Sequence, residues 1–256
     1  APNNLHHEML IGALQTDKAI YADKPMTVTL DEAREVLDVA RRAGRDAQMI
    51  LEFRYCPALQ QARAWVEEGR LGRVYACRAT YHRSSYRNPN KPLRWKAHRG
   101  AGVLHDYAPQ GGAARVIVDS DDHAVLLCAL PGGALGTVEV GRLIAGASND
   151  LTIELYGSER SLRWSLMDPN YLYLADPAVA ASEGGWMQVP TIQRYPEAVL
   201  PGADVPLGMM RFHIASVADF LRRTLADRVY DPGLAEGARV QAVIAAAEQS
   251  AQAGGA

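Results

Sequence analysis

The sequence predicts two units in series, an α/β unit with a parallel sheet over residues 1–72 and an α+β unit with an open-faced antiparallel sheet over residues 73–256. Two observations support this prediction. Before Gly72, apolar strands alternate with amphipathic helices, which favours parallel strands joined by helical crossovers. After Gly72, short β-branched and aromatic runs are separated by glycine-rich turns, which is typical of hairpins.

In the first unit we expect helices at 3–14, 30–44 and 57–69, and strands at 19–24 and 47–53. Asn3 or its neighbour Asn4 can cap the first helix. Thr29 and Glu32 have the spacing of a capping box at the start of the second helix, and Gly44 ends it. Pro57 suits the first turn of the third helix.

In the second unit we expect strands at 73–86, 123–130, 134–143, 151–156, 161–166 and 171–175, and helices at 208–226 and 232–251. Residues 177–206 are rich in Pro, Gly, Ala and Glu without a period, and they predict a long surface segment. The two closing helices can pack on either unit.

Composition excludes several classes of function. The 256 residues carry a net charge of -2, and their Lys and Arg residues are scattered, so neither nucleic acid nor an anionic membrane is an expected partner. Cys56, Cys77 and Cys128 are isolated, which favours reduced thiols and a cytoplasmic location. The seven histidines have no metal-ligand spacing, and no metal site is predicted.

Asp23, Lys24 and Pro25 follow the first predicted strand directly. Ligands of open α/β sheets lie beyond the carboxyl ends of the strands, so a lysine at this place points to a functional site. Pro25 restricts Lys24 to an extended conformation and gives it a defined direction. The alternative is an ordinary solvated surface turn.

A second polar cluster contains Trp95 and Lys96, and then Asp106 after a Gly-Ala-Gly step. The glycines allow close approach of the backbone, and the apolar residues before Asp106 place this acid on a fixed element. The alternative is a structural glycine-rich turn with a capping aspartate.

Several stretches together resemble the Gfo/Idh/MocA family of NAD(P)-dependent oxidoreductases, which act on sugars, inositols and related polyols. They are PNNLH at 2–6, KAIYADKPM at 18–26, PALQQARAWVEEGRLGRV at 57–74, LRWK at 93–96, GAGVLHD at 100–106, PGGALGTVEVGRL at 131–143 and LTIELYGSERSLRW at 151–164. The resemblance implies a partial Rossmann-type domain, NAD or NADP as cofactor, a small polyol or sugar substrate, and a homo-oligomer formed through the open sheet.

The resemblance also implies roles for individual residues. Lys24 would lie near the nicotinamide and the reacting hydroxyl, and Asp106 would act as the acid beside it. Gln110 occupies the position at which the family usually has its proton-accepting histidine. The residues expected along the cofactor or beside the substrate are Asn3, His6, Asp23, Pro25, Trp95 and Lys96, together with Lys24 itself.

Three departures from the family pattern qualify this expectation. The family's glycine-rich turn and the strand before it are absent, so we expect an incomplete chain. Gln110 carries an amide, which cannot act as a general base. The segment after Gln110 is shorter than in the family.

Two alternatives to the enzyme therefore stay open. One is a non-catalytic binding or scaffold protein that dimerises through its sheet, and the other is a polyol-binding partner that uses a cofactor held by another subunit. Titration with NADH separates a working site from the first alternative.

Overall fold

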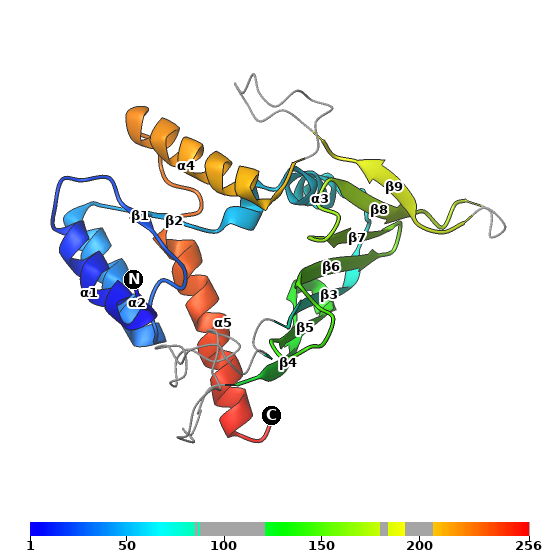
Figure 1. The fold of residues 1–256 in the computed structure, drawn as a ribbon, viewed down its shortest axis with the longest axis horizontal. Coiled ribbons are helices and arrows are strands. Elements are labelled where there is room, and N and C mark those ends of the chain that lie inside the picture. Colours follow the sequence, from blue (N-terminus) through cyan, green and yellow to red (C-terminus); the bar gives the residue numbers. More distant parts are fainter. Residues whose placement is uncertain (85–86, 88–120, 180–183, 193–206, 256) are drawn as a thin grey trace.

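The computed structural model describes residues 1–84, 87, 121–179, 184–192 and 207–255 (Figure 1). The helices are α1 (Asn3–Leu14), α2 (Leu30–Ala43), α3 (Pro57–Glu67), α4 (Met209–Leu225) and α5 (Leu234–Gln252). The strands are β1 (Tyr21–Ala22), β2 (Gln48–Met49), β3 (Val74–Arg83), β4 (His123–Ala129), β5 (Leu135–Gly141), β6 (Asn149–Gly157), β7 (Ser161–Ser165), β8 (Tyr171–Ala175) and β9 (Met187–Pro190). The predicted fold class, a parallel α/β part followed by a larger sheet with helices, is confirmed.

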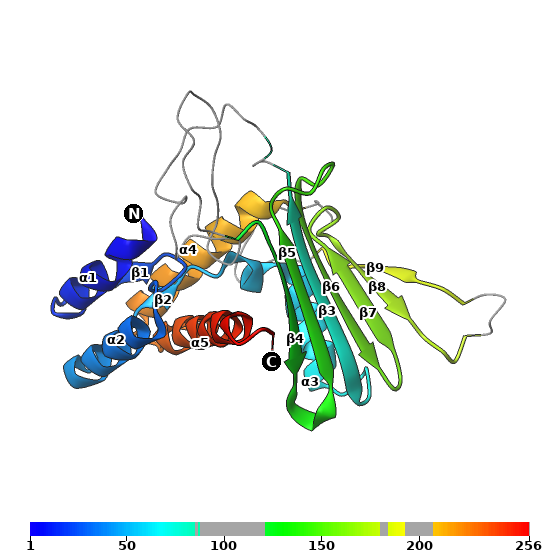
Figure 2. The ribbon, with the colours of Figure 1, turned by 90° about the horizontal axis from the view of Figure 1, so that it is seen from below.

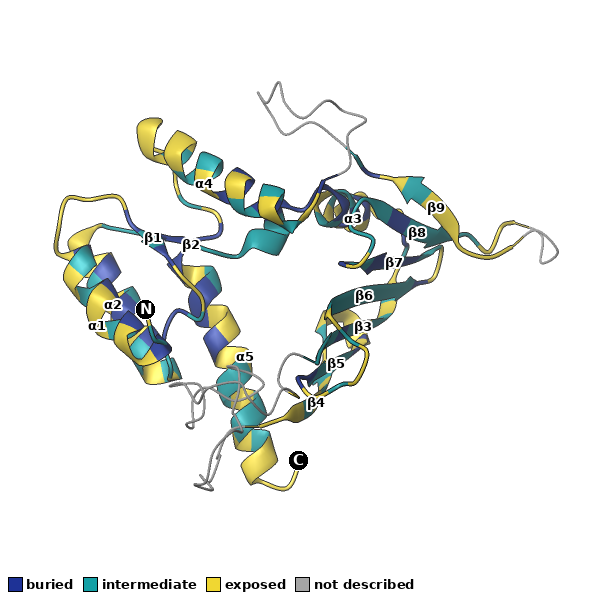
Figure 3. Cartoon of the chain, in the orientation of Figure 1, coloured by how far each residue is buried: buried dark blue, intermediate teal, exposed yellow. Residues whose placement is uncertain are grey.

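The first part is built on a parallel pair of strands, β1 and β2, in which Tyr21 lies opposite Gln48 and Ala22 opposite Met49. Helices α1, α2 and α5 supply most of the other buried side chains of this core (Figures 1 and 3). The cluster comprises Leu10, Leu14, Ile20, Ala22, Met26, Ala33, Val36, Ala40, Ala47, Met49, Leu234 and Ala238. The core of this part therefore joins residues from both ends of the sequence.

Local signals determine the ends of α2 and α3 as expected. The Thr29 hydroxyl accepts from the backbone N–H of Glu32, whose carboxylate accepts from the backbone N–H of Thr29 in return. Gly44 ends α2 in the left-handed conformation, at φ 62°, and Pro57 is the first residue of α3. The predicted asparagine cap of α1 is wrong, because Pro2 occupies the cap position and no side chain caps the helix.

The strand predicted over residues 47–53 is shorter than expected. Only Gln48–Met49 pairs with β1, and a 3₁₀ helix follows at Glu52–Tyr55. The Ile50 N–H still donates to the carbonyl of Ala22 in β1, at 2.8 Å, while the Met49 N–H points to the other side and donates to the carbonyl of Pro232 in the α4–α5 connection, at 2.9 Å. The pairing thus ends where the chain turns into the 3₁₀ helix, before the apolar run ends.

The second part is a seven-stranded sheet in the order β4-β5-β3-β6-β7-β8-β9. The prediction of a purely antiparallel sheet needs correction, because β3 and β5 run parallel while the other neighbouring pairs are antiparallel. The β4–β5 hairpin adds to the sheet with β5 next to β3, which produces this parallel pair. Strand β9 lies within the segment predicted as a surface excursion, and it pairs with β8.

One face of this sheet is buried and the other is open. Leu162 and Trp164 of β7 are buried in a core to which α3 and α4 contribute, and Figures 2 and 3 show the arrangement of these elements. The described helices lie on this side of the sheet, and the opposite face carries a row from Leu127 of β4 through Arg78 of β3 to Arg163 of β7. The core cluster comprises Tyr55, Cys56, Ala58, Ala62, Trp65, Leu71, Leu162, Trp164, Leu166, Leu172, Leu207, Phe212 and Ala215.

The two closing helices belong to different cores. Leu234 and Ala238 of α5 are buried in the first core, and Phe212 and Ala215 of α4 are buried in the second. Helix α3 also packs against the second sheet, so the core of that part includes residues that precede Gly72. The domain boundary near Gly72 stays a prediction.

Candidate active site

The parallel pairing of β1 and β2 brings two chain segments to one edge of the small sheet. Asp23, Lys24 and Pro25 follow β1, and the segment from Leu51 to Arg54 follows β2. Parallel strands have their carboxyl ends at the same edge, and this is where open α/β sheets bind ligands. The predicted position of Lys24 at a strand end is therefore observed.

Side chains hold the backbone of the Lys24 turn on both sides. The Asp23 carboxylate accepts from the Lys24 backbone N–H at 2.8 Å, and the His6 ring lies with Nδ1 2.7 Å from the Pro25 carbonyl oxygen. Further along, the Gln241 amide donates to the Val28 carbonyl at 2.8 Å. The turn is thus attached to α1 and α5 as well as to its own strand.

The Lys24 side chain is exposed at the centre of this turn. Within the described residues its ammonium group has no ion-pair partner, whereas Lys18, at the other end of the same strand, pairs with Asp17 at 2.9 Å. A backbone held by its neighbours and an ammonium group left for a ligand are the features expected of a preorganised site.

Asn3 and His6 lie one turn apart on α1, and both are buried, with 6 % and 7 % of their surface exposed. The Asn3 amide nitrogen has no hydrogen-bond partner in the described structure. A buried donor without a partner is costly, and a ligand that accepts a hydrogen bond would remove that cost. This atom fits a cofactor with carbonyl, hydroxyl or phosphate oxygens, such as a nicotinamide dinucleotide.

A polar network beneath the small sheet joins it to α4. The Gln48 amide donates to the Tyr55 hydroxyl at 2.9 Å, and Tyr55 donates to the Asp219 carboxylate at 2.9 Å. Burial, followed by the hydrogen bond to Asp219, raises the pKa of Tyr55 well above its usual range. Tyr55 therefore stays a neutral donor, and it fixes the position of α4 relative to β2.

Four of the predicted site residues lie outside the described residues. They are Trp95, Lys96, Asp106 and Gln110. Of the predicted set, the structure brings together His6, Asp23, Lys24 and Pro25, and it places Asn3 one turn before His6 on α1.

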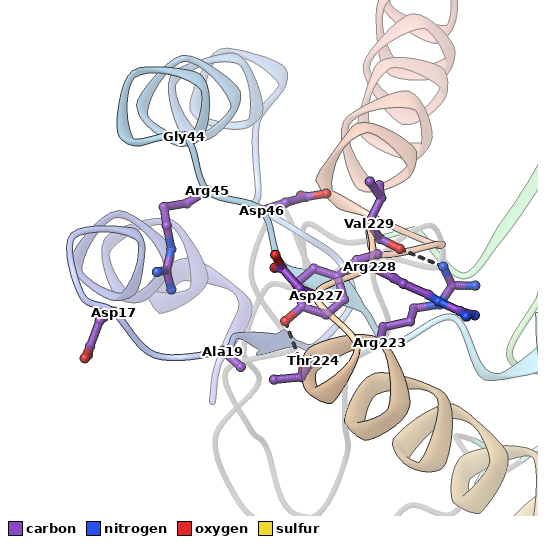
Figure 4. Close-up of a pocket in the computed structure, with 11 residues that line it drawn as sticks. Asp17, Ala19, Gly44, Arg45, Asp46, Arg223, Thr224, Asp227, Arg228 and Val229 are labelled. Carbon is purple, nitrogen blue, oxygen red and sulfur yellow. Dashed lines mark hydrogen bonds between the residues drawn. The ribbon is translucent and has the colours of Figure 1, made fainter.

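A cavity of about 470 Å³ lies at the opposite end of β1 from Lys24 (Figure 4). Ala19, before β1, and Gly44 and Arg45, after α2, line one side of it, and the α4–α5 connection lines the other. The Arg223 guanidinium donates to the Val229 carbonyl across this connection at 2.6 Å. Since the cavity is at the amino end of the strand, we do not assign the reaction to it.

The sequence did not indicate the roles of two residues at the site. Gln241 contacts Val28 across 213 positions, and the ring of His6 contacts the carbonyl of Pro25 across 19. No local spacing predicts such contacts. The sequence placed each residue on a helix, and the family resemblance named His6 among the residues expected along the cofactor, without its contact with Pro25.

A lysine at the end of a parallel strand, in a part followed by a large mixed sheet, agrees with the two-part nicotinamide-dependent oxidoreductases that the sequence resembles. Comparison with known families points to the same class. Residues 1–50 match the oxidoreductase family model with an NAD-binding Rossmann fold, and residues 59–109 match the GFO/IDH/MocA C-terminal domain. Both models describe the Gfo/Idh/MocA family, and the resemblance seen in the sequence is confirmed.

Individual relatives agree with this assignment. The chain is 26 % identical to levoglucosan dehydrogenase of Pseudarthrobacter phenanthrenivorans. The match covers 98 % of this chain and 76 % of that protein. The solved structure of a levoglucosan dehydrogenase with NADH and levoglucosan superposes with a TM-score of 0.88, over 98 % of this chain and 77 % of that one, at 26 % identity. An inositol dehydrogenase homologue from Azotobacter vinelandii shares the fold at 20 % identity, with a TM-score of 0.78 over 100 % of this chain and 75 % of that one.

Proposed function

We propose that this protein transfers a hydride between a hydroxyl-bearing carbon of a sugar or polyol and NAD. The observation that carries the proposal is the Lys24 turn, whose backbone is held by Asp23 and His6 while its ammonium group stays exposed at the carboxyl end of β1. The relatives named for levoglucosan act on a sugar derivative, and one of them has been solved with NADH.

The residues of this chain have separate tasks in such a reaction. NAD, when bound, supplies the acceptor for the hydride. Lys24 would bind the reacting hydroxyl and stabilise negative charge that develops on its oxygen as the proton leaves. Asn3 would donate to an oxygen of the cofactor, since its amide nitrogen is buried without another partner. Asp106 stays the predicted acid beside Lys24, and Gln110 can orient the substrate but cannot take its proton.

Replacement of the lysine tests this assignment. We expect Lys24→Ala in the native protein to lower the turnover of its sugar or polyol substrate by about 10²-fold or more, because the charge that stabilises the oxygen is lost. Steady-state kinetics with NAD measures this loss.

Lys18→Ala is the matched control, since it removes an exposed lysine at the other end of the same strand. Its turnover should be unchanged. Near-normal activity of Lys24→Ala would refute the role of the lysine.

A non-catalytic scaffold is the alternative that Gln110 favours. Titration of the 256-residue chain with NADH distinguishes an enzyme with a working cofactor site from a scaffold. The change in protein fluorescence reports the binding. Micromolar binding that weakens in Asn3→Ala supports the cofactor site. Binding that is unaffected by this substitution would contradict the role of Asn3.

We further propose a homo-oligomer that forms through the open face of the larger sheet. Val125, Leu127 and Leu135 expose apolar side chains at the β4–β5 edge of this face. Polar side chains lie beside them on the same edge of the face, where the carboxylate of Glu139 contacts the rings of His82 and His123 at 3.0 and 3.2 Å. A second copy could bury the apolar side chains and pair with these polar groups.

The cytoplasm is the compartment that we propose for this protein. Cys56, Cys77 and Cys128 are all free thiols, which is typical of proteins in a reducing environment. None of the described helices has both the length and the apolar character needed to cross a bilayer.

A further inference from the structure

The ring of His6 connects α1 to the turn that carries Lys24. Its Nδ1 lies 2.7 Å from the carbonyl oxygen of Pro25, the residue that follows Lys24, and its Nε2 lies 3.2 Å from the carbonyl oxygen of Ala1. A carbonyl oxygen only accepts hydrogen bonds, so Nδ1 must carry the proton that is shared with Pro25. The imidazolium form donates to both carbonyls.

This geometry separates His6 from the ligand. The side chain is buried with 7 % of the residue exposed, and each ring nitrogen already faces a backbone carbonyl. Neither nitrogen is left to bind a cofactor or a substrate. The neighbouring His7 differs, since its Nε2 lies at the surface, 3.1 Å from the Glu35 carboxylate of α2.

The hydrogen bond to Pro25 acts on the backbone of the turn directly after Lys24. On the other side of the lysine, Asp23 accepts the Lys24 backbone N–H at 2.8 Å. The two bonds together hold the peptide unit before Lys24 and the peptide unit between Pro25 and Met26. If the bond to Pro25 were lost, the lysine would keep its charge but lose its direction.

We propose that His6 is a positioning residue, which holds the Lys24–Pro25 turn in the geometry needed for hydride transfer and does not contact the ligand. This inference rests on the proposed function, because it assigns importance to the direction of Lys24. A misplacement of about 1 Å in a reacting group can cost about 10²-fold in rate, so an effect on turnover is expected from a residue that touches neither substrate nor cofactor.

Two substitutions and one control test the proposal. His6→Ala removes the donor, whereas His6→Asn restores an N–H at the same distance along the side chain as Nδ1. His7→Asn is the matched control on the same helix. Hydrogen exchange of the peptide that covers residues 19–30, measured on the 256-residue chain, reports the order of the turn without an activity assay. We expect faster exchange in His6→Ala, recovery in His6→Asn, and no change in His7→Asn.

Kinetics of the native protein gives the second readout. We expect His6→Ala to lower kcat about tenfold or more, with the Kd for NADH changed less than about threefold, and His6→Asn to recover most of kcat. A large loss of NADH affinity with kcat retained would show that His6 contacts the cofactor and would overturn the proposal. Unchanged kcat, measured well below the Tm of the variant, would show a purely structural role and would overturn it too.

Lys24→Ala separates this proposal from the proposed function. If Lys24→Ala keeps full activity while His6→Ala shows faster exchange at residues 19–30, the proposed function fails and the contact between His6 and the turn stands. If Lys24→Ala is inactive and His6→Ala matches the wild type in both readouts, the positioning role alone is refuted.

Discussion

Cys56 is a buried thiol at the start of α3, and its Sγ lies 3.7 Å from the carbonyl oxygen of Pro169. Burial raises the pKa of this thiol to about 11. Since the thiolate is the reactive species, we expect iodoacetamide at pH 8 to leave Cys56 unmodified in the folded protein, and its labelling to become faster only as the pH approaches that value.

Mass spectrometry of tryptic peptides measures this labelling. The control is the same protein in concentrated urea, where Cys56 should react as readily as Cys77 and Cys128. Rapid modification of Cys56 in the folded state would mean that α3 does not stay packed on the sheet.

Single residues also show what the sequence could reveal about the site. Lys24 was predicted because a strand, a charged pair and a proline are adjacent in the sequence. Asn3 was predicted as a helix cap, yet Pro2 occupies the cap position and the Asn3 amide is buried instead. The contact of Gln241 with Val28 could not be predicted, since only the folding of α5 against the first core brings these residues together.

Elements whose limits depend on local chemistry were predicted well. The capping box at Thr29 and Glu32, and the left-handed Gly44, set the two ends of α2 without help from the rest of the chain. Strands β2 and β9 were predicted poorly for the opposite reason. Strand β2 ends early because the chain turns into the 3₁₀ helix at Glu52–Tyr55, and β9 exists through its pairing with β8.

Gly157 ends β6 where it meets the residues before β3, and it shows how closely these elements pack. A Cβ at this position would lie 2.1 Å from the Leu71 carbonyl oxygen, a backbone atom that cannot move away alone. We expect Gly157→Ala to lower the free energy of unfolding by about 1–3 kcal/mol, the usual cost of an overpacked site.

Gly12→Ala is the matched control for this prediction. Gly12 lies inside α1, where an added Cβ would meet no atom within 4 Å. Because alanine favours a helix more than glycine does, this variant should be more stable by about 0.5–1 kcal/mol. Urea unfolding measures both changes, and a Gly157→Ala variant as stable as the wild type would contradict the close contact.

At the scale of the whole molecule, the proposed oligomer depends on the open face of the larger sheet. Leu127 of β4 lies at the apolar edge of this face with 74 % of its surface exposed. We expect Leu127→Asp to shift the protein to smaller species in sedimentation velocity, because a carboxylate would be buried without a partner at the interface between copies.

Leu225→Asp at the end of α4 is the control for this prediction. Leu225 is more exposed still, at 88 %, but it lies away from the sheet (Figure 1). An assembly that withstands Leu127→Asp, or that Leu225→Asp disrupts instead, would place the interface elsewhere.

Helix α5 connects the last part of the sequence with the first. Leu234 and Ala238 complete a core that otherwise consists of residues between Leu10 and Met49, and Gln241 holds the segment that follows Lys24. During synthesis the strands of the small sheet leave the ribosome long before α5 does. The Lys24 turn therefore reaches its final geometry only after α5 has been synthesised, and until then the apolar faces of α1 and α2 need other protection from aggregation.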